Sequence, residues 1–115
     1  MKNILAIVFL LTSAVTLAQN KTAKATIEVN GVCEMCEARI EKACLTTKGV
    51  KAANWDVQSH QLALVYNEKK TDLETIKQAV LDAGHDLVDA QATDEAYNSL
   101  HGCCRYRDKE VQDAH

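Results

Sequence analysis

The order in which hydrophobic periodicity changes along the chain constrains its fold most. Residues 24–31 alternate between apolar and polar side chains, which predicts a strand with one buried face. From Cys36 onwards, apolar residues recur at helical spacing, which predicts a helix that extends to Gly49. The elements predicted after this helix are two strands, a second helix and a last strand, over residues 50–57, 61–67, 71–84 and 85–90.

These elements follow the order strand, helix, strand, strand, helix, strand, which is the ferredoxin-like βαββαβ arrangement of an α+β protein. The residues between the two middle strands are enough for a hairpin turn. Right-handed crossovers predict an antiparallel sheet in the order fourth, first, third, second, with both helices on one face. Thr71 and Glu74 are expected to form a capping box at the start of the second helix, which Gly84 ends.

The beginning of the chain has the layout of a secretory signal peptide. A single lysine, Lys2, precedes an unbroken apolar run over residues 4–11, and small residues end the segment before Gln19. The run is too short to cross a bilayer, so a retained membrane helix is the weaker alternative. We therefore expect residues 1–18 to be removed and the protein to be periplasmic or secreted, without a membrane anchor afterwards.

The remaining chain is long enough for one small domain. We assign residues 19–23 as a lead, residues 24–90 as the domain and residues 91–115 as a C-terminal extension. In the extension, Thr93 or Asp94 can cap a short helix, and the charged tail is expected to be disordered. The chain carries a net charge of −3 without a basic patch, which argues against nucleic acid as a partner.

Two of the five cysteines, Cys33 and Cys36, lie at the junction of the first predicted strand and the first predicted helix. An odd number of cysteines leaves at least one thiol without a disulfide partner in the same chain. From the residues alone the pair fits a disulfide, a redox couple, half of a structural zinc site or an open metal site. Thiolates favour Cu(I), Hg(II) or Zn(II), and a helix amino terminus favours the thiolate form. Structural zinc would need two further ligands.

Residues 24–90 resemble the heavy-metal-associated domain family, which includes copper chaperones, amino-terminal domains of copper-pumping ATPases and the periplasmic mercury-binding protein. The resemblance rests on the hairpin, the capped second helix and three motifs, which are Val29-Asn30-Gly31, Cys33-Glu34-Met35-Cys36 and Ile40. The chain departs from the family in the loop before the first cysteine. It has one residue there, Val32, where the family commonly has Met followed by Thr or Ser.

The resemblance implies a soft-metal-binding protein, with Cu(I) as the expected ion and Hg(II) or Zn(II) as further candidates. It also implies that the Cys33 and Cys36 thiolates hold the ion and pass it to another thiol pair by ligand exchange. The implied partner is a metal donor or acceptor protein, such as a copper transporter or an efflux component. The protein would act as a monomer or as a metal-bridged dimer. We expect no enzymatic activity, since no nucleophile and base arrangement is visible.

Two histidines are predicted at the same end of the domain as the cysteine pair. In the family, the loop before the last strand often carries a Tyr, Lys or His beside the metal, so His85 is a candidate ligand or neighbour of the ion. The alternative is a partly exposed histidine that opens a strand. For His60, in the hairpin, a structural role is the favoured interpretation.

The remaining cysteines are interpreted by their distance from the pair. Cys44 lies too far along the first helix to reach the same ion and is expected in the core. A helix returning from the last strand could bring Cys103 and Cys104 to the pair, with His101 beside them. The alternative is that these two form a disulfide, with each other or with another chain, or are simply exposed.

Two other functions remain open from the sequence. One is a thiol–disulfide oxidoreductase that uses Cys33 and Cys36, although the Trp before the first cysteine and the active-site Pro of that family are absent and the chain contains no proline. The other is a structural secreted domain with two disulfides. A reduction potential and a metal stoichiometry separate these functions from metal binding.

Overall fold

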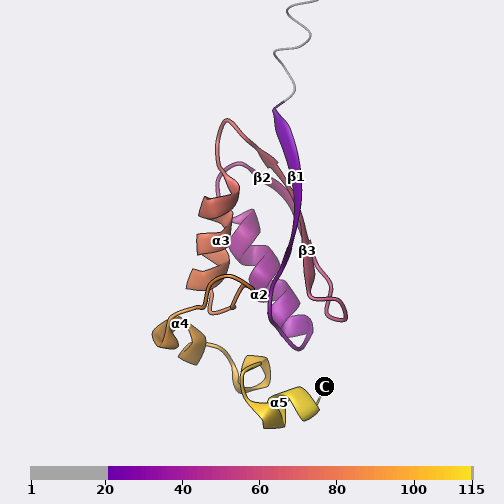
Figure 1. Cartoon of the computed structure of the whole chain (residues 1–115), viewed down its shortest axis with the longest axis vertical. Coiled ribbons are helices and arrows are strands. Elements are labelled where there is room, and N and C mark those ends of the chain that lie inside the picture. Colours follow the sequence, from indigo (N-terminus) through magenta and orange to yellow (C-terminus); the bar gives the residue numbers. More distant parts are fainter. Residues whose placement is uncertain (1–20, 115) are drawn as a thin grey trace, which may run out of the picture.

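A three-stranded antiparallel sheet forms one layer of the molecule, and the computed structural model describes residues 21–114 (Figure 1). The strands are β1 (Thr22–Glu28), β2 (Val50–Trp55) and β3 (Gln61–Asn67), in the order β1-β3-β2. Helices α2 (Glu34–Leu45) and α3 (Leu73–Asp82) lie side by side against one face of the sheet. The predicted ferredoxin-like α+β fold class is confirmed, whereas the predicted signal peptide lies outside the described residues.

Apolar residues from both helices and from the inner face of the sheet form the core. Alternate residues of β3 are buried, beginning with Leu62, on the face that the sequence predicts. Ile40 of α2 and both Ile76 and Val80 of α3 are fully buried. Trp55, at the end of β2, is also buried, and its ring lies against the loop that leads into α2. The hydrophobic periodicity therefore predicts this core correctly.

The fourth strand predicted over residues 85–90 is wrong. Within the described part of the chain, this segment joins the sheet only through an isolated bridge between Val29 and Leu87. Asp86 and Leu87 are both buried, and Val88 and Asp89 are both exposed, so the segment lacks the alternation of buried and exposed residues that a strand requires. The segment therefore remains at the end of the domain where α2 begins and does not run along β1.

The chain reverses direction after this bridge because local hydrogen bonds compete with strand pairing. The Leu87 N–H donates to the Ala90 carbonyl at 2.8 Å, which closes a turn. The Asp86 carboxylate accepts the Ala92 amide at 2.7 Å, so the backbone on both sides of the turn is drawn together. Aspartate side chains commonly offer the backbone such an alternative to a ladder.

The amino-terminal cap of α3 also differs from the prediction. The Asp72 carboxylate accepts the Thr75 amide at 2.8 Å and is the N-cap. The predicted capping box of Thr71 and Glu74 is therefore wrong. A carboxylate is as good a hydrogen-bond acceptor as a hydroxyl here, and its charge is stabilised by the helix amino terminus.

The two helices end differently, and only one of the two predicted glycine stops is correct. Helix α2 ends at Leu45, before Gly49, and the Thr46 and Thr47 hydroxyls donate to carbonyls of its last turn, including that of Ala43 at 3.2 and 3.0 Å. Helix α3 ends at Asp82, and Gly84, which follows the C-cap residue Ala83 and has φ +102°, is the predicted stop.

Gly84 also allows the extension to approach the domain closely. The residue after it, His85, donates its N–H to the Val80 carbonyl at 3.3 Å, which completes a Schellman motif. A Cβ atom on Gly84 would lie only 2.6 Å from the Ala96 carbonyl oxygen. Glycine is therefore required here both for the left-handed backbone and for the contact with the extension.

The C-terminal extension folds against the end of the domain where α2 begins (Figure 1). It contains α4 (Asp94–Asn98), the 3₁₀ turn η1 (Gly102–Cys104) and α5 (Lys109–Asp113). Thr93 caps α4 as predicted, with its hydroxyl accepting the Ala96 amide at 3.2 Å. Since α5 forms within the charged tail, the expectation of disorder is wrong for that helix. Among residues 21–114, no helix is sufficiently long and apolar to span a membrane.

Candidate metal centre

The loop that leads into α2 places Cys33 and Cys36 at the amino end of that helix. Cys33 is the N-cap residue, and Cys36 lies in the first turn and is fully buried. A Cβ atom on Gly31 would lie 2.9 Å from the Trp55 ring and 3.0 Å from the Cys36 Cβ atom. The loop is therefore packed tightly between the indole ring and the helix, and only glycine fits at this position.

Trp55 is a residue of the site that the sequence analysis missed. Its indole N–H donates to the Val29 carbonyl at 3.0 Å, and its backbone N–H donates to the Glu41 carboxylate at 2.9 Å. His60 stacks on its ring at 5.6 Å between centroids. These contacts fix the Trp55 ring, on which the cysteine loop packs, and agree with a structural role for His60. The position of the only tryptophan near the end of a strand was the available signal.

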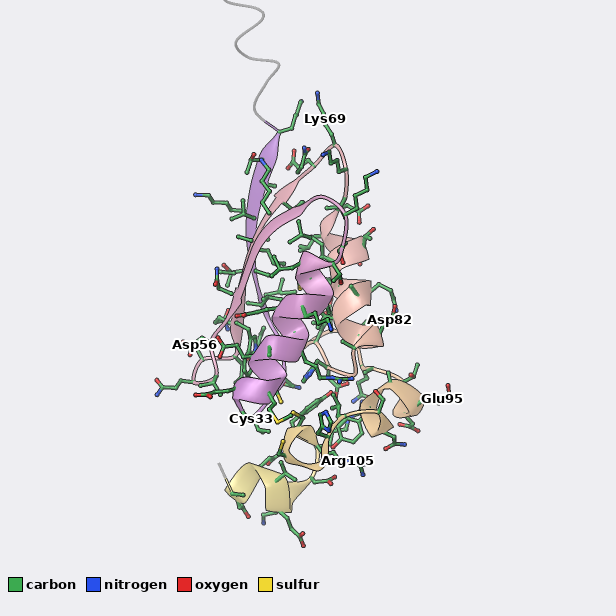
Figure 2. The ribbon with its side chains drawn as sticks, turned by 180° about the vertical axis from the view of Figure 1, so that it is seen from behind. Cys33, Asp56, Lys69, Asp82, Glu95 and Arg105 are labelled. Carbon is green, nitrogen blue, oxygen red and sulfur yellow. The ribbon has the colours of Figure 1, made fainter. Side chains whose placement is uncertain are left out.

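Sulfur atoms from two distant parts of the sequence meet at the amino end of α2 (Figure 2). The Cys33 Sγ lies 3.7 Å from the Cys36 Sγ and 3.7 Å from the Cys104 Sγ. The Cys103 Sγ lies 4.0 Å from the Cys104 Sγ and 3.3 Å from the Met35 Sδ. We call the four cysteines and this methionine the sulfur cluster. All five cysteines of the chain are free thiols in the structure.

The described residues contain one group of three potential metal ligands whose donor atoms all lie within 4.8 Å of one another. The group consists of the Sγ atoms of Cys33, Cys103 and Cys104. Cys104 is fully buried, whereas Cys33 is half-buried and Cys103 is exposed. The structure thus brings four of the five predicted site residues together, and the interpretation of Cys103 and Cys104 as simply exposed is wrong for Cys104.

The thiols of the cluster differ in how readily they ionise. Burial opposes ionisation of Cys33, but hydrogen bonds from the Cys36 amide and from the Cys104 and Cys36 thiols outweigh it and lower its pKa. Burial raises the pKa of Cys36. Burial and the neighbouring Cys36 and Cys33 thiols raise the pKa of Cys104. Among Cys33, Cys36 and Cys104, Cys33 therefore loses its proton first, and the neighbouring hydrogen-bond donors stabilise its thiolate.

The fifth predicted residue, His85, is fully buried, so the alternative of a partly exposed histidine is wrong. Its Nδ1 atom lies 2.8 Å from the Asn30 carbonyl oxygen, so Nδ1 carries the proton and donates it. Its Nε2 atom is buried and has no hydrogen-bond partner among the described residues. Burial lowers the pKa of the imidazole. Only Nε2 is left to bind a metal, and it does not belong to the three-sulfur group.

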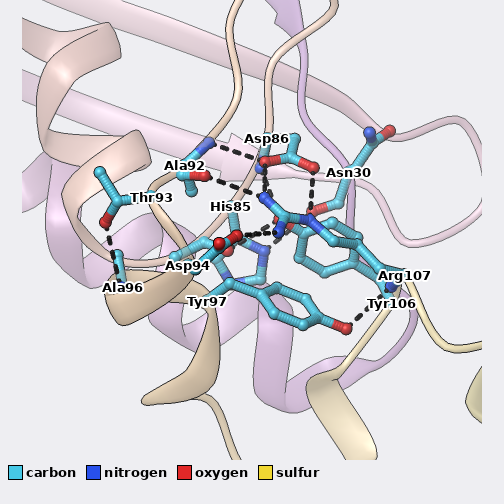
Figure 3. Close-up of polar contacts among 11 residues, drawn as sticks. Asn30, His85, Asp86, Ala92, Thr93, Asp94, Ala96, Tyr97, Tyr106 and Arg107 are labelled. Carbon is cyan, nitrogen blue, oxygen red and sulfur yellow. Dashed lines mark hydrogen bonds and ion pairs between the residues drawn. The ribbon is translucent and has the colours of Figure 1, made fainter.

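A network of aromatic and charged residues holds the extension beside His85 (Figure 3). The Tyr106 ring stacks on the His85 ring at 5.4 Å, and its hydroxyl donates to the Gly84 carbonyl at 2.8 Å and accepts the Asp86 amide at 2.7 Å. The Arg107 guanidinium binds both Asp86 carboxylate oxygens at 2.7 and 3.0 Å. It also lies 4.3 Å over the Tyr97 ring. We call Asp86, Tyr97, Tyr106 and Arg107 the clamp.

The negative Asp86 carboxylate and the positive Arg107 guanidinium stabilise each other within the clamp. Burial would raise the pKa of the Asp86 carboxyl, but hydrogen bonds from Arg107 and from the Ala92 amide lower it below its usual value. Bidentate Arg–carboxylate pairs are among the stronger ionic hydrogen bonds in proteins. Asp86 therefore remains charged at neutral pH and holds the extension at two points, the Ala92 amide and the Arg107 side chain.

Cys44 lies away from the sulfur cluster, as predicted. It is fully buried in the core between α2 and the sheet. Burial, together with the nearby Glu41 carboxylate, raises the pKa of its thiol to about 11. The thiol is therefore protonated at neutral pH and behaves as a small apolar side chain.

Comparison with known proteins agrees with this architecture. The chain is 32% identical over 62 residues to the copper chaperone CopZ of Staphylococcus haemolyticus, covering 53% of this chain and 91% of that protein. It is 35% identical over 68 residues to a probable copper-exporting P-type ATPase of Archaeoglobus fulgidus, covering 58% of this chain but 8% of the ATPase. The chain thus spans nearly all of the chaperone and a small part of the ATPase.

A solved structure gives the same result for the fold. The amino-terminal domain of a potential copper-translocating P-type ATPase from Bacillus subtilis, in its Cu(I)-loaded state, superposes with a TM-score of 0.55 at 31% identity. The match covers 57% of this chain and 84% of that domain. The model of the family "Heavy-metal-associated domain" matches residues 26–86, which excludes α4, η1 and α5. The chain belongs to the heavy-metal-associated domain family.

Proposed function

We propose that this protein binds a soft metal ion, Cu(I) in the first place, through the Cys33 and Cys36 thiolates. The observation that carries the proposal is the position of both sulfurs at the start of α2, 3.7 Å apart, in a chain of the heavy-metal-associated domain family. Thiolates are soft ligands that suit Cu(I), and the lowered pKa of Cys33 favours the ionised form that binds metal.

The same residues suit transfer of the ion by ligand exchange. A cavity of about 460 Å³ opens beside Cys33 and Cys103 and is also lined by Val32, Met35 and Val57. An incoming thiolate can approach the ion from this side. We therefore propose that the protein is a chaperone or scavenger in metal transport or detoxification, whose partner is a copper transporter or an efflux component. Similarity to the named copper chaperones supports this proposal.

The proposed compartment is the periplasm or the extracellular space. Support comes from the apolar run over residues 4–11 and the small residues before Gln19. Expression in a bacterial host should give a protein whose mass matches residues 19–115, recovered outside the cytoplasm. Recovery of the uncleaved chain from the cytoplasm would overturn this part of the proposal.

A Cu(I) titration against a chromophoric chelator, under reducing and oxygen-free conditions, tests the binding site. The protein should bind one Cu(I), and the C33S/C36S variant should lose this binding. The matched control is C44A, which removes a thiol outside the cluster and should bind as the wild type does. Fluorescence of Trp55, which lies below the loop, provides a second readout of binding. Hg(II) and Zn(II) titrations on the same variants establish the metal preference.

The same titration separates metal binding from the redox alternative. If the wild type binds Cu(I) no more tightly than C33S/C36S, the metal proposal fails. The thiol–disulfide function then predicts a Cys33–Cys36 disulfide that forms and is reduced reversibly. A reduction potential measured against glutathione would detect that reversible pair.

A further inference from the structure

The sulfur cluster contains more ligands than the two-cysteine motif requires. Cys33 contacts thiols on both sides, since its Sγ lies 3.7 Å from the Cys36 Sγ and 3.7 Å from the Cys104 Sγ. The Cys36 thiol also lies 3.9 Å from the Cys104 carbonyl oxygen. Cys104 comes from η1, which is separated from Cys33 by 71 positions in the sequence and lies outside the family match. The extension therefore places a buried thiol directly over the cysteine pair.

The distances between these sulfurs indicate how many ligands an ion would have. With a metal–sulfur bond of about 2.3 Å, neighbouring sulfurs lie about 3.8 Å apart in a tetrahedral site, about 4.0 Å in a trigonal site and about 4.6 Å in a linear site. The observed Sγ–Sγ distances are 3.7, 3.7 and 4.0 Å. The Sγ atoms of Cys33, Cys103 and Cys104 all lie within 4.8 Å of one another, which suits three sulfur ligands. Cys36 adjoins this group through Cys33, 3.7 Å away.

The position of Cys104 is fixed by packing that does not involve a metal. Tyr97, Leu100, Cys104 and Tyr106 are all buried and belong to the same core as α2 and β3. On the far side of Cys104, Arg107 forms its bidentate pair with Asp86. The Cys104 thiol is thus held between Leu100 and Tyr106, which are both buried. It needs no rearrangement to reach Cys33.

We propose that the extension supplies Cys104 and Cys103 as ligands to the ion held by Cys33 and Cys36, so that the chain closes its own metal site. This inference rests on the proposed function and adds the ligand set and its consequence. Each thiol that binds the ion gives its proton to solvent, no sulfur–sulfur bond forms and the ion keeps its oxidation state. The closed site retains the ion more strongly than the cysteine pair alone.

The structure also indicates where a closed site opens. Cys103 is exposed and, with Cys33 and Met35, lines the cavity beside the cluster. Cys36 and Cys104 are fully buried, so an external thiol reaches Cys103 and Cys33 first. Exchange therefore begins at the exposed sulfurs, and the buried sulfurs leave the ion last.

A C103S/C104S variant of the protein tests this ligand set. X-ray absorption of the Cu(I)-loaded wild type should give at least three sulfur ligands, and the variant should give two. Competition with the chelator should show Cu(I) bound at least about tenfold more weakly by the variant, since a tethered ligand adds avidity. C44A should match the wild type in both measurements. Two-coordinate copper in the wild type, or equal affinity in the two proteins, would overturn the inference.

Two further measurements keep the test decisive. Because Cys104 is buried, the circular dichroism and melting temperature of metal-free C103S/C104S must match the wild type; if they do not, C103S alone is used, since Cys103 is exposed. Alkylation of Cys103 should be slower with bound Cu(I), and equal rates would contradict its role as a ligand. If the wild type binds no Cu(I) at all, the proposed function itself fails. That result differs from two-coordinate binding or equal affinities, which overturn only the ligand set inferred here.

Discussion

The part of the chain that matches the family and the extension beyond it are held together by different kinds of contact. In the first, helices α2 and α3 pack on the sheet through fully buried apolar residues such as Ile40, Leu62 and Ile76. In the second, the short elements α4 and η1 depend on the clamp and on buried sulfur. An apolar core tolerates varied sequence, whereas the extension needs particular residues at particular positions.

The difference implies that the two regions can be weakened separately. The core is continuous from the sheet through both helices, so a defect there should lower the stability of the whole chain. The clamp holds the extension at the end of the domain where α2 begins, so a defect there should release the extension and leave the sheet folded (Figure 1). Stability that varies between regions in this way is common in proteins.

The largest effect is expected from Ile40→Ala in α2. Ile40 is fully buried, so the truncation should lower the free energy of unfolding by about 2–5 kcal/mol. Urea unfolding of the reduced, metal-free protein, followed by circular dichroism, measures this change. Leu45→Ala on the same helix is the control, because Leu45 is 51% exposed and its truncation should have little effect. Equal losses in both variants would contradict the assigned core.

A smaller and local effect is expected from Arg107→Ala. The change removes both hydrogen bonds to the buried Asp86 carboxylate and should weaken docking of the extension by about 2 kcal/mol. Hydrogen exchange should accelerate in α4 and η1 but not in the sheet, and alkylation of Cys104 should become faster. Lys109→Ala, which removes an exposed basic residue of the extension, is the control. Faster exchange throughout the sheet would show that the two regions are not separable.

The smallest effect is expected when the pH is lowered far enough to protonate Asp86. The folded-state pKa of Asp86 is lowered, so this carboxylate stabilises the protein above its unfolded pKa of about 3.9, and the contribution disappears as the pH falls through the lower folded value. Unfolding free energies of the wild type should therefore fall more steeply below about pH 4 than those of Asp86→Asn. Parallel pH profiles for the two proteins would contradict the role of Asp86 in the clamp.

The sequence predicts the family-like region well because its signals are periodic. Alternation in the strands and helical spacing in α2 and α3 report burial directly, and Cys33 and Cys36 lie at the predicted strand–helix junction. The missing fourth strand is a failure of the same reasoning, since residues 85–90 have an acceptable strand pattern. There the decisive contacts are those of the Asp86 carboxylate with Ala92 and Arg107, which lie later in the sequence and leave no periodic signal.

The approach of Cys103 and Cys104 to the cysteine pair was predicted as one of two alternatives, but by a different route. The prediction required a fourth strand leading away from the site and a helix returning to it. In the structure the chain turns between Leu87 and Ala90 and remains near the start of α2. A turn of this kind depends on individual hydrogen bonds, whereas the path length alone suggested only that contact was feasible.

The docking of η1 has a consequence for competition with thiols in solution. Because the clamp and the buried tyrosines hold Cys104 beside Cys33, its thiol acts at an effective concentration of about millimolar or more. A dissolved thiol must approach that concentration before it displaces Cys104 from an ion at the site. A partner that carries two thiols close together can meet the same requirement locally, so the extension would favour transfer to a dithiol protein over loss to small thiols.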